Sequence, residues 1–213
     1  MAKGYFIVFE GPDGSGKTTI STGVFERLKA EGYSVIYTRE PGGIDIAEQI
    51  RNVILDPKNT AMDARTEALL YAASRRQHLV EKVLPALAEG KIVLCDRFVY
   101  SSLAYQGCGR HLGMEAVMDI NRFAIENYMP DKTIFLDVPV ERGLSRLEAR
   151  AFKDRLDVET LQFHKDTYEG YQRVLEQYKD SMIVVDASRT KEEVLEETYK
   201  IVKDIIHESR RVF

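Results

Sequence analysis

The sequence predicts an α/β fold in which a five-stranded parallel sheet is flanked by helices. Five short apolar runs with β character alternate with longer helical patterns, the order of elements typical of a parallel sheet covered on both faces. A glycine-rich G-x-x-x-x-G-K-T segment joins the first strand to the first helix. The 213 residues suit one domain better than two, and 44% of them are hydrophobic, enough for a sizeable core. We therefore expect a single domain over residues 1–213.

The overall charge and the cysteine content argue against several classes of protein. The formal net charge is −4, so there is no general basic character of the kind that binds nucleic acid or membrane surfaces. Cys95 and Cys108 have neither the spacing of a metal site nor the number that a disulfide framework needs. The first residues do not have the pattern of a signal peptide, and no apolar run approaches about 18 residues. We expect a cytoplasmic protein.

Residues 5–9 form the first predicted strand, and residues 19–30 form the first predicted helix. The G-x-x-x-x-G-K-T segment between them is a phosphate-binding loop (P-loop) in the strand–loop–helix context that this motif requires. Its glycines let backbone N–H groups converge on phosphate oxygens, and the start of the helix adds partial positive charge. Lys17 would reach the β- and γ-phosphates, and the Thr18 hydroxyl would bind Mg²⁺. The motif predicts a P-loop NTPase fold, with a nucleoside triphosphate bound by Gly11, Gly14, Ser15, Gly16, Lys17, Thr18 and Thr19.

The second predicted strand, residues 34–38, runs into the loop Arg39-Glu40-Pro41-Gly42-Gly43. Ligands of such sheets bind beyond the carboxyl ends of the strands, which is where this loop begins. Arginine pairs with phosphate through two parallel hydrogen bonds, so Arg39 could hold the phosphate of an acceptor. A solvated loop arginine is the commoner case, but the position at the sheet edge favours binding.

The predicted helix over residues 63–84 carries Tyr71 and Arg75 four residues apart, and therefore on one face. A ring beside a guanidinium group could stack on a base and donate to its carbonyl oxygen. A core tyrosine with a surface arginine is the commoner arrangement when nothing else is known. Both alternatives remain open from these two residues alone.

The third predicted strand, residues 92–95, is followed by Asp96 and Arg97. Asp96 could orient Mg²⁺, directly or through water, although aspartate is also common where a strand turns. The adjacent Arg97 adds a clamp for an anion. Further along, Gln106 offers both a donor and an acceptor, as recognition of the N3–H edge of a pyrimidine requires. Taken alone, Gln106 would be an ordinary turn residue.

The C-terminal part of the chain supplies two more predicted strands, residues 133–138 and 182–185, and a basic segment between them. Arg146 and Arg150 lie one helical turn apart, and Arg155 follows an expected break in the helix. Such a segment could close over phosphates and neutralise developing charge, although charge-rich helices are usually only solvated. A final helix is predicted after the capping box formed by Thr190 and Glu193.

These motifs, in this order, resemble the bacterial thymidylate kinases. The resemblance covers essentially the whole chain, with matching segments at residues 9–19, 38–43, 67–76, 96–98, 101–107 and 146–157. It implies transfer of the γ-phosphate of ATP to thymidine monophosphate (dTMP), with Mg²⁺ as the cofactor. It also implies the fold of nucleoside monophosphate kinases, a lid at about residues 146–157 and a homodimer, with no nucleic acid polymer and no membrane as partner.

The resemblance assigns residues to the phosphate and sugar of dTMP. Arg39 and Arg97 would hold its phosphate, and Asp13 would face the 3′-hydroxyl. Tyr105 would crowd C2′ and disfavour ribonucleotides, while Arg51 would support this side of the site. The full implied dTMP-binding set is Asp13, Arg39, Arg51, Tyr71, Arg75, Arg97, Ser102, Tyr105 and Gln106, and the implied catalytic set is Lys17, Arg97, Arg150 and Asp13.

The same resemblance assigns roles at the base and in the lid. Tyr71 would stack on thymine, Arg75 would bond O4, and Gln106 would bond N3. In one subclass of the family a P-loop arginine supplies the catalytic cation, and in the other a lid arginine does. The lid arginines here are Arg146, Arg150 and Arg155, and the variable P-loop positions are Gly14 and Ser15, which implies the lid-arginine subclass with Arg150 as first choice.

Two positions depart from the family pattern. Ala151 stands where the family often has glycine, so the backbone there has less conformational freedom. Phe98 stands where the family has histidine or tyrosine, so this side chain has no polar tip for hydrogen bonding.

The sequence also bears on three alternatives to a dTMP kinase. A regulatory GTPase would need a guanine-reading Asn-Lys-x-Asp motif, and the sequence has none. A kinase acting on deoxynucleosides or on another monophosphate is disfavoured by the acceptor arginines and by the set of side chains suited to a pyrimidine. A non-enzymatic ATP-binding module would bind nucleotide without turnover when dTMP is added.

Overall fold

The computed structural model describes residues 4–126, 128–148 and 154–210. The five strands are β1 (Tyr5–Glu10), β2 (Val35–Arg39), β3 (Ile92–Asp96), β4 (Lys132–Asp137) and β5 (Met182–Asp186). They pair in parallel in the order β2-β3-β1-β4-β5, so the predicted parallel sheet is confirmed. The predicted strand ends differ from the observed ones by at most one residue. Three strands (β1, β2 and β3) extend to include the polar residues Glu10, Arg39 and Asp96.

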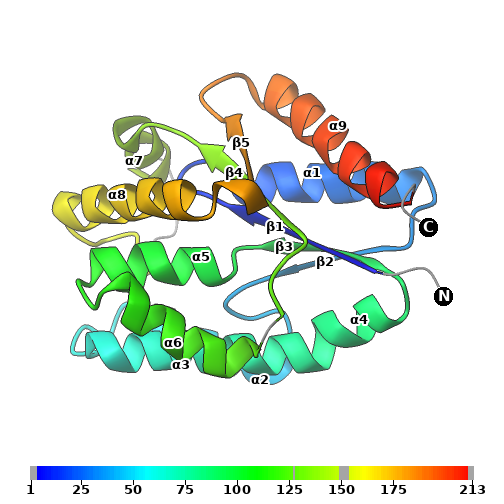
Figure 1. Ribbon diagram of the computed structural model, residues 1–213. Coiled ribbons are helices and arrows are strands. Elements are labelled where there is room, and N and C mark those ends of the chain that lie inside the picture. The colour runs from blue at the N-terminus through cyan, green and yellow to red at the C-terminus, as the bar shows by residue number, and fades with distance from the viewer. Residues whose placement is uncertain (1–3, 127, 149–153, 211–213) are drawn as a thin grey trace.

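Helices surround the sheet on both faces (Figure 1). The α-helices are α1 (Lys17–Ala30), α2 (Asp45–Leu55), α3 (Ala64–His78), α4 (Leu84–Ala88), α5 (Val99–Ser102), α6 (Met114–Ile125), α7 (Val140–Glu148), α8 (Leu161–Gln177) and α9 (Lys191–Arg210). Two π-helical segments, η1 (Leu79–Val83) and η2 (Leu103–Gly109), and a 3₁₀ turn, η3 (Lys179–Ser181), complete the described elements.

Successive side chains of β1 point into two different cores. Ile7 and Phe9 pack with α1 and α9, whereas Phe6 and Val8 pack with the helices on the opposite face. All four side chains are at most 2% exposed. Because both faces of β1 are covered, the strand is apolar throughout rather than alternating, as is typical of central parallel strands.

The helix predicted over residues 63–84 continues further than expected. α3 is capped by Asp63, whose carboxylate accepts from the backbone of Arg65 and Thr66, and the helical path runs through η1 into α4. Proline inside a helix ordinarily ends it, because proline has no N–H and its ring clashes with a carbonyl one turn earlier. The π-helical turn directly before Pro85 re-spaces these carbonyls and lets the helix continue.

The predicted capping box at the start of α9 is confirmed. Thr190 Oγ1 accepts from the backbone N–H of Glu193, and the Glu193 carboxylate accepts from the backbone N–H of Thr190. Among the described residues, no helix is both long and apolar enough to span a membrane.

Candidate active site

The polar ends of three neighbouring strands meet at one edge of the sheet. The strand register sets Asp96 beside Arg39 on one side and beside Phe9 on the other, and the P-loop follows β1 directly. A cleft opens along this edge. Its lining includes the P-loop residues Asp13, Gly14, Gly16, Lys17, Thr18 and Thr19, and it also includes Arg39, Arg51, Tyr71, Arg75, Asp96, Arg97, Ser102, Tyr105 and Gln106. The structure therefore brings most of the sequence-predicted site residues to one place.

The P-loop curves tightly between β1 and α1. Gly16 is the N-terminal cap of α1 with φ 87°, and Gly14 has φ 76°, both in the left-handed region that glycine tolerates best. A side chain at Gly14 would also overlap the backbone of Gly143 in α7. This conformation leaves the N-terminus of α1 free to offer its N–H groups to an anion.

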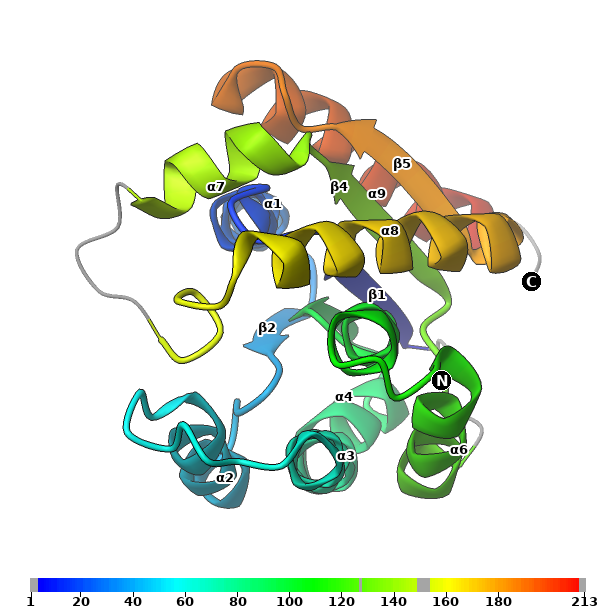
Figure 2. The ribbon, with the colours of Figure 1, turned by 90° about the vertical axis from the view of Figure 1, so that its left-hand side faces the viewer.

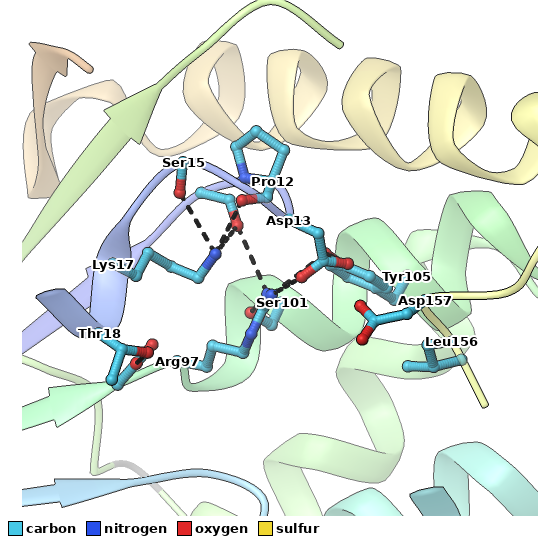
Figure 3. A network of polar contacts seen from close by, with 12 residues as sticks. Pro12, Asp13, Ser15, Lys17, Thr18, Arg97, Ser101, Tyr105, Leu156 and Asp157 are labelled. Carbon is cyan, nitrogen blue, oxygen red and sulfur yellow. Dashed lines mark hydrogen bonds and ion pairs between the residues drawn. The ribbon is translucent and has the colours of Figure 1, made fainter. Parts of the chain in front are cut away.

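Lys17 lies folded back under the P-loop (Figure 3). Its Nζ donates to the carbonyl oxygens of Gly11 and Pro12, both at 2.8 Å, and to Ser15 Oγ at 3.3 Å. The side chain is buried, and burial together with the neighbouring positive charge of Arg97 lowers the pKa of Lys17 to about 7. A bound polyphosphate would offset both effects.

Thr18 and Asp96 provide two oxygen ligands side by side. The Thr18 hydroxyl donates to Asp96 Oδ2 at 2.6 Å. Hydroxyl and carboxylate oxygens suit Mg²⁺, which takes its remaining ligands from water and substrate phosphates. Within residues 4–126, 128–148 and 154–210, no group of three or more His, Cys, Asp or Glu side chains could hold a metal. A magnesium ion at Thr18 and Asp96 would therefore depend on the nucleotide for much of its coordination.

Arg97 reaches from the end of β3 toward the P-loop (Figure 3). Its guanidinium pairs with Asp13 and donates to Tyr105 Oη at 3.2 Å, Tyr171 Oη at 3.2 Å and Ser101 Oγ at 3.1 Å. The backbone of Arg97 has φ 71°, a left-handed conformation that costs about 1–3 kcal/mol for a residue other than glycine. Strain of this kind is typical of functional positions.

Asp13 stays a strong acceptor despite its burial. Burial by itself raises the pKa of this carboxyl, but the charges of Arg97 and Lys17 outweigh it. The hydroxyl of Tyr105 donates to Asp13 Oδ2 at 2.6 Å and adds to the same effect. The net result is a pKa below the ordinary value, so Asp13 is ionised at neutral pH and can accept from a hydroxyl group.

Glu10 holds the turn that presents Arg97, a role that the sequence analysis missed. Its buried carboxylate accepts from the backbone N–H groups of Phe98 at 2.9 Å and Ser101 at 3.0 Å. It also accepts from Ser101 Oγ at 2.5 Å and Tyr171 Oη at 3.1 Å, and burial raises its pKa. The sequence signal was an acidic residue at the end of an apolar strand, which does not reveal its partners.

Arg75 is neither a surface residue nor free in the cleft. Its guanidinium donates to Glu40 Oε2 at 2.7 Å, to Phe98 O at 2.9 Å, to Ser102 Oγ at 3.1 Å and to Asn121 Oδ1. These bonds occupy four of its five N–H donors, and the side chain is only 2% exposed. Arg75 therefore belongs to the core as well as to the wall of the cleft, which it shares with Tyr71.

Replacing Arg75 with alanine is expected to lower the free energy of unfolding by about 3–5 kcal/mol, because the buried Glu40 carboxylate would lose its guanidinium partner and keep only the contact with His78 Nδ1 at 2.9 Å among the described residues. Urea unfolding followed by circular dichroism measures this. Arg76→Ala is the matched control, since the Arg76–Glu126 pair is exposed and such pairs contribute about 0–1 kcal/mol. Equal losses in the two variants would contradict the structural role of Arg75.

Arg39 and Arg51 share one acceptor at the mouth of the cleft. Both donate to the carbonyl oxygen of Pro41, at 3.0 Å and 2.9 Å, and Arg39 also pairs with Glu48 at 2.9 Å. The two cations therefore converge on the loop after β2, on the side of the cleft away from α1.

The arginines predicted for the lid have separate positions. Arg146, in α7, donates to Gly14 O at 3.0 Å and Ala187 O at 3.3 Å, which ties α7 to the P-loop. Arg155 is buried and pairs with Glu67 at 2.6 Å, so it does not lie over the P-loop as the sequence analysis expected. Arg150 and Ala151 lie outside the described residues.

Gln106 lies in the π-helical segment η2 rather than in a turn. Its Nε2 donates to the buried carboxylate of Glu67 at 2.8 Å, and the side chain lines the cleft. Glu67 also was assigned no role from the sequence. Its position in α3 gave no indication that residues so far apart along the chain would converge on it.

Comparisons with known proteins show the family to which this chain belongs. The family model described as thymidylate kinase matches residues 9–198. The thymidylate kinase of Bacillus pumilus is 54% identical over 209 residues, covering 97% of this chain and 99% of that protein. The thymidylate kinase of Clostridium novyi is 53% identical over 205 residues, covering 95% and 100%. A crystal structure of thymidylate kinase from Ehrlichia chaffeensis superposes with a TM-score of 0.76 at 31% identity, covering 94% of this chain and 99% of that one. The chain belongs to the thymidylate kinase family.

Proposed function

We propose how the described residues divide the work of a dTMP kinase, the enzyme that phosphorylates dTMP to dTDP with ATP. The observation that carries the proposal is the cleft itself. Its lining runs from the P-loop residue Lys17, past Asp13 and Arg97, to Tyr71 and Gln106. Two nucleotides can therefore meet end to end, with their phosphates between Lys17 and Arg97.

The P-loop side takes the donor. Backbone N–H groups at the start of α1 and the ammonium group of Lys17 bind the β- and γ-phosphates of ATP. Thr18 and Asp96, whose oxygens lie 2.6 Å apart, would hold Mg²⁺. When bound, Mg²⁺ supplies charge neutralisation on the phosphate oxygens.

The other side takes dTMP. Arg97 and Arg39 bind its phosphate, Asp13 accepts from the 3′-hydroxyl, and Tyr105 closes the space beside C2′. Thymine stacks on Tyr71. The support is geometric, because these side chains line one wall of the same cleft.

Four further residues complete the acceptor site. Arg75 donates to O4 of thymine through its remaining N–H, and Gln106 forms a hydrogen bond with N3. Ser102 holds Arg75 in place at 3.1 Å, and Arg51 supports the loop after β2.

The chemical step needs alignment and charge neutralisation rather than a strong base. A phosphate oxygen of dTMP is already anionic near neutral pH and forms the new bond to the γ-phosphorus, while the bond to the β-phosphate oxygen breaks and ADP leaves with the electron pair. Lys17 and a lid arginine neutralise the transferring group. We assign that arginine to Arg150, which makes the protein a member of the lid-arginine subclass, because Arg146 already donates to the carbonyl oxygen of Gly14 and Arg155 is paired with Glu67.

The affinity for ATP is expected to fall as pH rises above 7. Lys17 must be protonated to bind phosphate, and its pKa is about 7 without nucleotide. Binding of ATP therefore raises the pKa of Lys17, and above pH 7 the protein takes up a proton when ATP binds. Below pH 7 Lys17 is already protonated and contributes no pH dependence. Titration calorimetry at pH 8, in two buffers with different ionisation heats, should report uptake of most of one proton per ATP. The control variant Lys17→Met should bind weakly without this uptake, and a wild-type protein that takes up no proton would contradict the argument.

One assay tests the proposed function as a whole. ADP formation is measured with ATP and each common nucleoside monophosphate in turn, and turnover should be fastest with dTMP. ATP binding without turnover would instead support a non-enzymatic module, and preference for a purine monophosphate would remove the proposed base site.

We also propose a homodimer formed through α2, α3 and α6, which lie side by side in Figure 2. Each of these helices exposes a large apolar side chain: Val53 is 48% exposed, Leu69 56% and Phe123 90%. Exposed apolar surface of this kind is typical of protein interfaces. Light scattering should give the mass of two chains, and a single-chain mass would contradict the dimer.

We place the protein in the cytoplasm. Cys95 and Cys108 are free thiols, as is usual in a reducing compartment. Fractionation of cells with an antibody to the protein tests this location.

A further inference from the structure

A single buried carboxylate, that of Glu67, receives hydrogen bonds from three side chains. Its side chain is 1% exposed. Oε1 accepts from Gln106 Nε2 at 2.8 Å, and Oε2 accepts from Arg155 Nη2 at 2.6 Å. Arg110 spans both oxygens, with Nε at 3.3 Å from Oε1 and Nη2 at 3.1 Å from Oε2.

The two arginines beside Glu67 are themselves fixed. Arg155 Nε donates to Ile54 O at 2.7 Å, at the C-terminal end of α2. Arg110 Nη2 donates to Glu159 at 2.5 Å. Because both cations have other anchors, the position of the Glu67 carboxylate is set independently of Gln106.

We propose that Glu67 is a positioning residue that fixes the orientation of the Gln106 amide and thereby selects thymine over cytosine. The inference rests on the proposed function, in which Gln106 contacts the base. A carboxylate flanked by two guanidinium groups only accepts hydrogen bonds, so the end of Gln106 that faces Glu67 must be the NH₂ group. The carbonyl Oε1 is then the polar atom that Gln106 presents to the cleft it lines.

This orientation distinguishes the two pyrimidines. Thymine and uracil carry N3–H, which donates to Oε1, whereas N3 of cytosine is an acceptor and faces Oε1 unfavourably. The two ends of a glutamine amide have nearly the same shape, so Gln106 without a fixed partner could rotate and offer NH₂ to cytosine. Gln106 therefore needs Glu67 in order to discriminate.

The variant Glu67→Gln tests the proposal. In this variant the carbonyl oxygen of residue 67 should take the place of Oε2, where both arginines donate, which turns its NH₂ toward Gln106. Gln106 must then rotate, with Oε1 toward residue 67 and NH₂ toward the base. We expect the ratio of kcat/KM for dTMP to kcat/KM for dCMP to fall at least about tenfold, since a reversed buried hydrogen bond changes specificity strongly. The dTMP to dUMP ratio should stay unchanged, because both bases carry N3–H.

Two further variants separate orientation from general damage. The exchange variant Glu67→Gln with Gln106→Glu keeps one carboxylate in the cluster and again presents an acceptor oxygen to the base, so the preference for dTMP over dCMP should recover. Glu159→Gln is the matched control, because it alters the outer contact of Arg110 and leaves the Glu67–Gln106 bond in place. Its acceptor ratios should equal those of the wild-type protein.

The outcomes have separate meanings. If Glu67→Gln slows all three acceptors equally, Glu67 is only structural and the proposal is overturned. An exchange variant that folds but stays unselective overturns it as well. Failure of the proposed function appears differently: Gln106→Ala would then leave the KM for dTMP unchanged, or the wild-type protein would show no preference for dTMP.

Discussion

Replacing Arg150 with alanine is expected to reduce kcat for dTMP by about 10³-fold, the size of effect that arginine fingers have in phosphoryl transfer. Charge on the γ-phosphate oxygens must be neutralised as the phosphate moves. The P-loop itself carries no arginine, since Gly14 and Ser15 occupy its variable positions. Arg146 and Arg155 are bonded to Gly14 and to Glu67, which makes Arg150 the proposed source of the charge.

Steady-state kinetics separates this role of Arg150 from binding. The KM for dTMP should change little, because Arg150 acts mainly in the transition state. Arg27→Ala is a suitable control, since the Arg27–Glu196 pair is partly exposed and remote from the cleft. That variant should retain wild-type kcat. If Arg150→Ala also kept a kcat within a few-fold of wild type, the lid-arginine mechanism would be wrong.

Replacing Arg97 with methionine is expected to lower kcat/KM for dTMP by about 10³-fold, from the loss of a charge-assisted phosphate contact and the exposure of an unpaired carboxylate. Arg97 neutralises Asp13 in the unliganded protein. Without it, Asp13 would repel the phosphates of both nucleotides. The affinity for ATP alone should fall less than kcat/KM for dTMP, because Lys17 and the N-terminus of α1 remain to bind ATP.

A double-variant cycle tests the coupling between Arg97 and Asp13. Asp13→Asn alone should reduce kcat/KM, but in the Arg97→Met background it removes the unpaired charge and should restore part of the activity. The two effects are therefore expected to be strongly non-additive. Simple multiplication of the two losses would show that the ion pair has no part in dTMP binding. Arg97→Lys retains the charge and should lie between wild type and Arg97→Met.

The sequence predicted the fold well because its evidence is local. Alternating apolar runs and helical patterns gave the five strands, and the G-x-x-x-x-G-K-T spacing located the P-loop between β1 and α1. The ends of β1 and β3 were placed one residue early, because Glu10 and Asp96 are polar residues at the ends of otherwise apolar strands. The helical path that runs from α3 through η1 into α4 continues beyond Leu84. This continuation was missed, because a π-helical turn that accommodates Pro85 has no simple pattern in sequence.

The candidate site was predicted in outline but not in its internal bonding. The rule that ligands bind at the carboxyl ends of parallel strands brought Arg39, Asp96 and Arg97 into consideration. The burial of Arg75 was not predicted, since it depends on Glu40 and Asn121, which lie 35 and 46 residues away in the chain. Arg155 was expected over the phosphates, yet its partner Glu67 lies 88 residues away in the chain.

The sequence by itself determined the class of fold, the phosphate-binding loop and the charged side chains at the sheet edge, because short-range spacing and the alternation of elements specify them. Only the tertiary structure decided which charges are paired. Glu10 bonds to the turn after Arg97, and Glu67 bonds to Gln106 and Arg155. These are contacts between segments that lie far apart in the chain. The physical reason is that a buried charge is stable only beside a partner, and the folded chain, not the local sequence, determines which partner is within reach.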